Sequence, residues 1–207
     1  MTSKKLLPLS GIAFVVSILA TVIGIGGSTP DTDASAATVL AYYDAHDTRQ
    51  ILAAFLIAAA VPFLVFFGVS LAGGVRSFWE LVVIVGTGLA ATGFLLTALF
   101  HFALADAPGN ESAPDVAKAL AMLDGDFWMA VNAALGVLML GAAGTMLQRK
   151  ARWLGWPALV IGIALFVPFA DFFALLLTGV WITVTSVVLS REATESAPVM
   201  REAVAAA

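Results

Sequence analysis

Residues 153–190 read WLGWPALVIGIALFVPFADFFALLLTGVWITVTSVVLS and contain one charged residue, Asp171. As a single helix these 38 residues would extend about 57 Å, nearly twice the roughly 30 Å hydrocarbon thickness of a bilayer. The stretch must therefore cross a membrane, turn near Asp171 and cross back. This length argument predicts an integral membrane protein that crosses the bilayer several times.

The composition supports the same class of protein. The chain of 207 residues is 61% hydrophobic and 12% charged, whereas soluble domains are about 45–50% apolar and about 25% charged. It contains no cysteine, which excludes disulfides, thiol nucleophiles and thiolate metal sites. The length suits one bundle rather than two domains.

Four further uncharged stretches are each long enough for the ~20 apolar residues of a spanning helix. We therefore predict an all-α, polytopic membrane bundle of six transmembrane helices in one domain, residues 1–190, with a polar cytoplasmic tail, 191–207. The predicted helices cover residues 6–27, 51–74, 79–105, 127–148, 153–170 and 172–190. The first run also resembles a signal peptide with a cleavage site near Ala34-Ser35-Ala36, but its 22 uncharged residues exceed the usual length of a signal's apolar region and favour an uncleaved helix.

The basic residues predict the orientation. With both termini in the cytoplasm, eight of the ten basic residues are inside and only Arg49 and Lys118 are outside, which follows the positive-inside rule. The inside set is Lys4, Lys5, Arg76, Arg149, Lys150, Arg152, Arg191 and Arg201. The predicted location is the plasma membrane, with multiple passes and both termini cytoplasmic.

The two outer loops resemble each other. Val39 matches Val116 and Asp47 matches Asp124, at a common offset of 77 residues. Apolar residues recur at helical spacing in both loops, as at Val39 and Tyr43. We therefore predict a short amphipathic helix in each outer loop, lying against the membrane surface.

Small residues recur at four-residue spacing within the predicted helices, as at Gly86 and Ala90, and at Gly141 and Thr145. Such pairs allow two membrane helices to approach closely. In a chain this rich in alanine and glycine, the pairs also arise by chance.

Few polar residues are placed to form a site. By the helix count, Arg49, His101, Asn132 and Asp171 share the outer third of the bundle and form a candidate binding vestibule, with Arg49 as the counter-ion of Asp171. Weaker candidates are His46, Asp47 and Asp106. Each residue also has a structural explanation: Asp171 as a water-exposed turn residue, His101 as an interfacial histidine and Asn132 as a hydrogen bond between helices.

No residue pattern indicates catalysis, a cofactor or a metal. Only two histidines are present, so a haem or metal site would need His46 and His101 to converge with carboxylates. The sequence contains no phosphate-binding loop, nucleophile elbow or HExxH motif. The expected partners are the lipid bilayer and a second copy of the chain or another membrane protein, not nucleic acid.

Three short sequence segments make the chain resemble multi-pass membrane proteins of undetermined activity that are common in high-GC actinobacteria. They are Lys4-Lys5 before Leu6-Leu7-Pro8-Leu9-Ser10-Gly11, Thr29-Pro30-Asp31, and Arg152-Trp153-Leu154-Gly155-Trp156. The resemblance implies a bacterial plasma membrane and no particular activity.

Three classes of function fit the sequence. The scarcity of buried polar residues favours a non-enzymatic accessory or scaffold bundle. The outer polar group and the prolines within helices, Pro62 and Pro168, fit a small solute or ion carrier. A membrane-embedded enzyme or lipid-binding protein would use Asp171 or His101 on a substrate in the outer leaflet.

Cysteine labelling tests the predicted topology in this cysteine-free chain. Single cysteines at Ser35 and Ser112 should react with an impermeant thiol reagent in intact cells, whereas a cysteine at Ser77 should react only after lysis. Labelling at Ser77 but not at Ser35 in intact cells would contradict the orientation.

Overall fold

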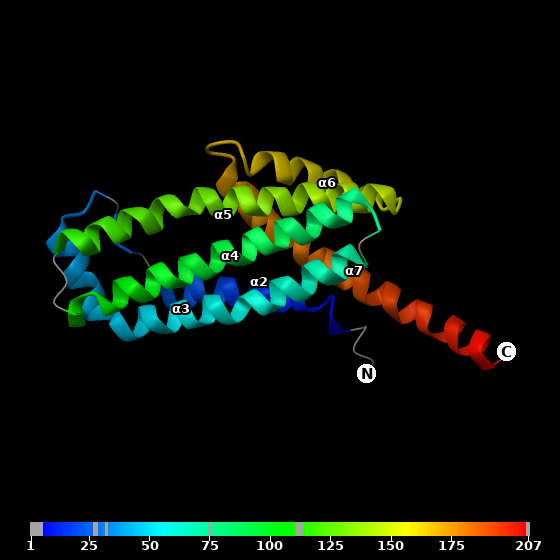
Figure 1. Ribbon diagram of the computed structural model, residues 1–207, viewed down its shortest axis with the longest axis horizontal. Helices are drawn as coiled ribbons and strands as arrows, with labels where there is room; N and C mark the ends of the chain where they lie inside the picture. The colour runs from blue at the N-terminus through cyan, green and yellow to red at the C-terminus, as the bar shows by residue number, and fades with distance from the viewer. Residues whose placement is uncertain (1–5, 27–28, 32, 75, 111–113, 206–207) are drawn as a thin grey trace.

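The computed structural model describes residues 6–26, 29–31, 33–74, 76–110 and 114–205. These residues form a bundle of long antiparallel helices and contain no strand (Figure 1). Lys4, Lys5 and Ser112, on which parts of the sequence analysis depend, lie outside the described residues.

Six helical segments follow one another in the predicted order. They are α2 (Ser10–Leu19), continued by the π-helix η1 (Ala20–Gly26), then α3 (Ala36–Ala72), α4 (Phe78–Asp106), α5 (Pro114–Gln148), α6 (Arg152–Ala164) and α7 (Asp171–Ala205), with a short 3₁₀ helix η2 (Pro108–Asn110) between α4 and α5. Four of them, α3, α4, α5 and the part of α7 up to Glu192, are long and apolar enough to cross a membrane. The segments Ser10–Ile25 and Arg152–Ala164 are apolar but shorter. The all-helical prediction is therefore confirmed, with four candidate membrane spans.

The helices predicted for the two loops are present, but they are not separate elements. The first forms the beginning of α3, where a non-helical backbone at His46 (φ −130°, ψ 18°) kinks the helix before it continues. The second is the uninterrupted beginning of α5. α6 ends at Ala164 because the ring of Pro168 would clash with the carbonyl group four residues earlier.

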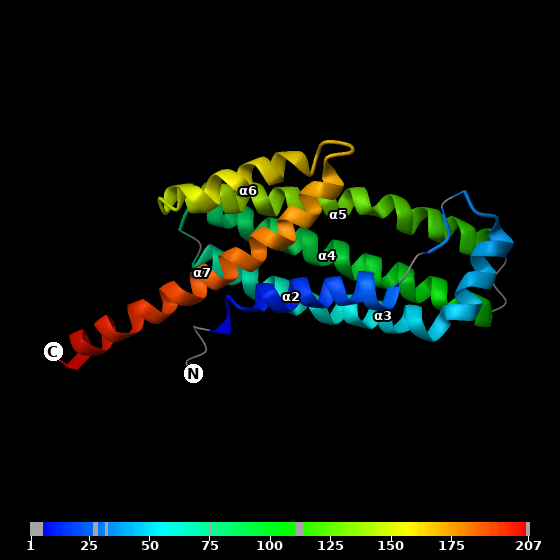
Figure 2. The ribbon, with the colours of Figure 1, turned by 180° about the vertical axis from the view of Figure 1, so that it is seen from behind.

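The bundle has two distinct ends (Figure 1). The α2–α3 and α4–α5 connections lie at one end, the long-loop end. The α3–α4 and α5–α6 turns lie at the other, the short-turn end, which carries Arg76, Arg149, Lys150 and Arg152. The α6–α7 turn lies part-way along the bundle, and α7 crosses the back of it diagonally (Figure 2).

α4 and α5 form the closest helix pair, because glycine lets their backbones meet. A Cβ atom added to Gly86 would lie 2.5 Å from the backbone nitrogen of Leu138, and one added to Gly141 would lie 2.6 Å from that of Val83. Gly93 faces Val131 in the same register. The small residues at positions 86 and 141 thus do allow close approach. They also fix which residues of α4 and α5 face each other.

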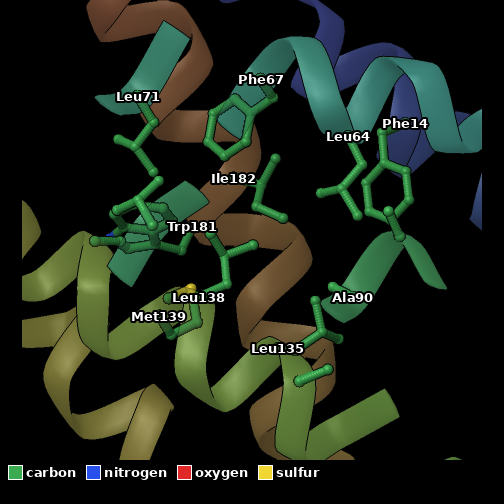
Figure 3. Close-up of a cluster of buried hydrophobic side chains, with 14 of the residues drawn as sticks. Phe14, Leu64, Phe67, Leu71, Ala90, Leu135, Leu138, Met139, Trp181 and Ile182 are labelled. Atoms are coloured by element: carbon green, nitrogen blue, oxygen red, sulfur yellow. The ribbon is translucent and has the colours of Figure 1, made fainter. Parts of the chain in front are cut away.

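Large side chains fill the centre of the bundle. Leu64 and Phe67 of α3, Leu138 of α5 and Ile182 of α7 are nearly fully buried and belong to one cluster, which also includes Ala90 (Figure 3). The indole Nε1 of Trp181 donates a 3.0 Å hydrogen bond to the carbonyl of Leu154, which joins α7 to α6. This packing separates the long-loop end from the short-turn end.

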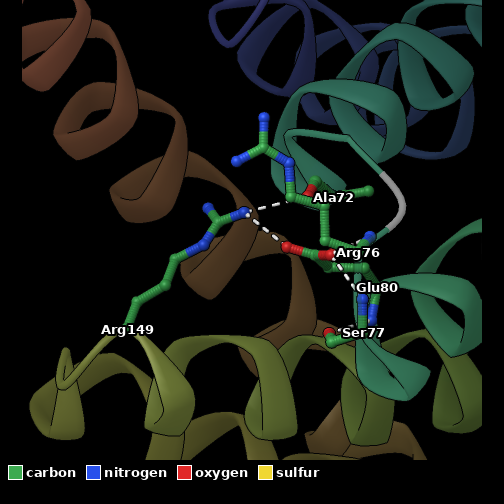
Figure 4. A network of polar contacts seen from close by, with 5 residues as sticks. All are labelled: Ala72, Arg76, Ser77, Glu80 and Arg149. Carbon is green, nitrogen blue, oxygen red and sulfur yellow. Dashed lines mark hydrogen bonds and ion pairs between the residues drawn. The ribbon is translucent and has the colours of Figure 1, made fainter.

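Arg149 joins three helix ends at the short-turn end (Figure 4). Its Nη2 donates to the carbonyl of Ala72, at the end of α3, at 2.9 Å, and lies 3.6 Å from Oε1 of Glu80. Glu80 also accepts from the backbone N–H of Ser77 in a capping box that begins α4. A cation at a helix C-terminus and an acid at a helix N-terminus are both favourable to the helix dipoles.

Substituting glycines on α4 tests the close contact with α5. Gly86→Ala should lower the free energy of unfolding in detergent by about 1–3 kcal/mol, because the new Cβ meets backbone that cannot move aside. Gly88→Ala, with nothing within 4 Å of its Cβ, should be neutral or stabilise by up to about 1 kcal/mol. Equal effects of the two substitutions in a thermal or denaturant titration would contradict the contact.

Candidate functional site

The register between α4 and α5 brings His101 and Asp124 together. Counting outward from the Gly93–Val131 contact places residue 101 of α4 beside residues 123–124 of α5. His101 Nε2 lies 3.7 Å from Asp124 Oδ2, and both side chains are only 17% exposed. The second carboxylate oxygen of Asp124, Oδ1, is buried and has no hydrogen-bond partner among the described residues.

Gln50 and Tyr42 of α3 connect His101 to the kink in α3. His101 Nδ1 donates to Gln50 Oε1 at 3.2 Å, and Gln50 Nε2 donates to the Tyr42 hydroxyl oxygen, also at 3.2 Å. The ring of Tyr42 stacks on the ring of His46 with centroids 4.5 Å apart. The two histidines thus belong to one polar chain, although they do not meet.

A cavity of about 220 Å³ adjoins the His101–Asp124 pair. α2 and η1, α3, α4 and α5 each contribute to its walls, and its surface is mostly apolar. Its lining comprises Ile18, Thr21, Val22, Thr29, Ala53, Ile57, Phe94, Thr97, His101, Asp124, Gly125 and Trp128. The carboxylate of Asp124 therefore sits at the edge of an apolar chamber whose lining includes the aromatic residues Phe94 and Trp128.

A second cavity of about 490 Å³ shares Thr29, Asp124 and Gly125 with the first. It is more polar, and its lining adds Asp31, Asp33 and Tyr43. Three carboxylates thus surround this space at the long-loop end, and neither lining includes a lysine or arginine. We call the first cavity the chamber and the second the mouth.

The predicted pairing of Arg49 with Asp171 is wrong. Arg49 is exposed, and its Nε donates to the carbonyl of Ile25 in η1. Asp171 Oδ2 instead accepts a 3.1 Å hydrogen bond from Nδ2 of Asn132, whose side chain is buried. The cause is the position of the α6–α7 turn, because the register of α6 against α5 (Gly136 faces Phe166) brings the start of α7 beside Asn132.

The four strongest candidates therefore do not form one vestibule. Asn132 lies eight residues beyond Asp124 on α5, about 12 Å along the helix. His101 belongs to the chamber, Asn132 and Asp171 form a separate contact at the α6–α7 turn, and Arg49 holds the end of η1.

The weaker candidates have local contacts. His46 Nδ1 donates to the carbonyl of Tyr42 at 2.8 Å. Asp47 accepts from the backbone N–H and the hydroxyl of Thr48, where α3 resumes after its kink. Asp106 is exposed at the end of α4.

Sequence reasoning did not identify Asp124 and Gln50 as site residues. The sequence places Asp124 in the second predicted loop and Gln50 just before the predicted helix at residues 51–74. One signal was available: Asp124, Trp128 and Asn132 recur every four residues and so share one face of a continuous helix.

No group of three or more His, Cys, Asp or Glu residues able to hold a metal ion occurs in the part of the chain that the structure describes. No family model, curated protein sequence or solved structure matches the chain. The chemistry of the site must therefore be argued from its own residues.

Double-mutant cycles distinguish the observed contact from the predicted one. Asn132→Ala and Asp171→Ala should show a coupling energy of about 0.5–1.5 kcal/mol in unfolding experiments, the range of hydrogen bonds between membrane helices. Arg49→Gln and Asp171→Asn should be additive within about 0.3–0.5 kcal/mol. Coupling of residue 171 to residue 49 but not to residue 132 would contradict the structure.

Proposed function

We propose that the protein is a six-span plasma-membrane protein that binds a small cation with an apolar body in the chamber, from the outer side, without chemical conversion of the ligand. The scarcity of buried polar residues favours a non-enzymatic role, and a binding function keeps that character while adding a ligand.

The depth of the α6–α7 hairpin supports six crossings. Asn132, which contacts the start of α7, lies 17 residues before Arg149 on α5, about 25 Å along the helix. The hairpin therefore spans nearly the roughly 30 Å of a hydrocarbon core. α2 with η1 packs along α3 and provides the remaining short crossing.

The charges at the two ends support the orientation. Arg76, Arg149, Lys150 and Arg152 gather at the short-turn end, which by the positive-inside rule faces the cytoplasm. The chamber and its mouth then open to the outside. α3 and α5 are longer than a membrane span requires, and their N-terminal parts extend beyond the hydrocarbon on that side.

The chemistry of the two cavities selects a cation. Asp124 offers a buried carboxylate oxygen with no hydrogen-bond partner among the described residues, and this observation carries the proposal. A buried, unsatisfied charged group costs free energy that a bound cation would recover. Asp31 and Asp33 raise the local cation concentration at the mouth.

The apolar chamber selects the body of the ligand. Ile57 and Phe94 line its inner part, and Trp128 presents an aromatic wall that attracts cations as well as apolar groups. Below Phe94 the core is filled by Leu64, Phe67 and Leu138, so a ligand entering from the mouth is held in the outer part of the bundle. A monocation of the alkylammonium type fits these requirements.

A second candidate function is transport of the same cation. It is favoured by η1, because π-helical segments are frequent at functional sites and are less regular than α-helix. η1 follows α2 at the edge of the chamber, where Thr21 and Val22 are wall residues. Net movement of the cation across a vesicle membrane would separate transport from binding alone.

The binding proposal is tested with hexyltrimethylammonium as the probe. The purified protein is placed in phosphatidylglycerol nanodiscs, whose lipids carry no amine, and binding heats are measured against empty nanodiscs. Asp124→Asn should weaken binding at least about tenfold, or roughly 1.4 kcal/mol, because the counter-charge is lost. Asp126→Asn, two residues away on α5 and exposed, is the matched control and should bind as the wild type does.

Neutral and anionic analogues complete the experiment. Hexanol and hexanesulfonate should bind far more weakly than the cation. If adding phosphatidylethanolamine to the nanodisc competes with the probe, the natural source of the cation is a lipid headgroup; no competition indicates a free solute. Equal binding of the cation by wild type and Asp124→Asn would contradict the proposal.

A further inference from the structure

We propose that the cation and a proton exchange at the His101–Asp124 pair, so that each ligand bound releases about one proton. This inference rests on the proposed cation-binding function and adds proton coupling to it. It is carried by the hydrogen-bond directions in the chain Tyr42–Gln50–His101–Asp124.

The orientation of the Gln50 amide determines whether Nε2 of His101 faces Asp124 as a donor or as an acceptor. Gln50 donates from Nε2 to Tyr42, and so its Oε1 accepts the hydrogen of His101 Nδ1. A neutral His101 in this arrangement would have a lone pair on Nε2 facing the oxygen of Asp124 at 3.7 Å. Two acceptors facing each other repel, so this arrangement of the amide favours a proton on one of them. The empty site holds a pair that carries one proton and no net charge.

A cation bound beside Asp124 changes this balance. If the proton stayed, the chamber would hold two positive charges and one negative charge in a largely apolar space, which is unfavourable. Loss of the proton leaves one cation and one carboxylate and restores neutrality. Exchange of one for the other is therefore the arrangement of lowest electrostatic cost.

Tyr42 and Gln50 let the site function in both states. When the proton leaves, reversal of the Gln50 amide lets Nε2 donate to His101 Nδ1 and lets the Tyr42 hydroxyl donate to Oε1. His101 then carries its hydrogen on Nε2 and donates toward Asp124. Tyr42 and Gln50 are thus positioning residues, and every member of the chain has a partner in both states.

Other titratable groups near the pair could also change the pH dependence of binding, and the test must distinguish their protonation from that of the pair. Asp31 and Asp33 face Asp124 from the α2–α3 connection across the mouth, and Tyr43 faces it from α3. The lining residues contributed by α2 and η1 are Ile18, Thr21 and Val22, which do not titrate. On α4 and α5 the titratable lining residues are His101 and Asp124 themselves.

The test measures hexyltrimethylammonium affinity in phosphatidylglycerol nanodiscs between about pH 5 and pH 9, where histidines and perturbed carboxyls exchange protons. In two buffers of different ionisation heat, the difference in binding heat gives the number of protons released. Wild type should release close to one proton per ligand in the acidic part of the range and lose affinity about tenfold per pH unit there. Full affinity should return at alkaline pH.

Two variants assign the proton to the pair. His101→Gln keeps a polar side chain and leaves Asp124 as the proton acceptor of the pair, so proton release near neutral pH should fall and the pH midpoint of probe affinity should move lower. Gln50→Glu places a second carboxylate against His101 Nδ1 and retains the proton more strongly, which should move the affinity midpoint to higher pH. The carboxylates at the mouth are unchanged in both variants.

The outcomes separate the two proposals. If the wild type and Asp124→Asn bind the probe equally at every pH, or if neither binds it, the binding function itself is overturned. Binding that depends on Asp124 but varies less than about twofold over the pH range would overturn only the proton coupling. Proton release that persists unchanged in His101→Gln, in protein that is monodisperse and helical, would also overturn it.

Discussion

The arrangement of the site depends on the backbone contact between α4 and α5. Gly86 and Gly141 lie where the two helices meet, and a Cβ atom at either position would collide with main chain of the other helix. Since backbone cannot rotate away as a side chain can, this contact fixes the register along the whole pair. His101 and Asp124 are adjacent because they lie further along the same register, toward the long-loop end.

The distribution of polar groups follows from this arrangement. Deeper in the bundle the described helices meet mainly through leucine, phenylalanine and alanine, and the buried polar residues there are mostly threonine and serine. Near the long-loop end, α3 and α5 extend past the apolar core, α3 with a kink at His46, and their N-terminal parts carry Tyr43 and Asp124. A carboxylate held there by rigid helices, beside an apolar chamber, has a defined position that a loop residue would lack.

Much of the fold could be predicted from the sequence, because apolar length and turn residues act locally. The start of α4 after Ser77 and the end of α3 at Gly73, whose φ of +66° suits glycine, follow local rules of capping. The site could be predicted only in part. His101 was identified, but its partner Asp124 lies 23 residues further along the chain, and only the register of two helices brings them together. The Arg49–Asp171 prediction failed for the same reason, since equal depth in a membrane does not give the same side of a bundle.

A structure of the protein in a lipid nanodisc with 6-bromohexyltrimethylammonium tests the central claim most directly, because bromine can be located by its anomalous scattering or its density. We expect the ammonium group within about 5 Å of the Asp124 carboxylate, the range of a cation–carboxylate contact. The bromine should lie in the chamber near Ile57 and Phe94. Bromine found only on the outer apolar faces of α6 and α7, with the chamber empty at saturating probe, would contradict the account.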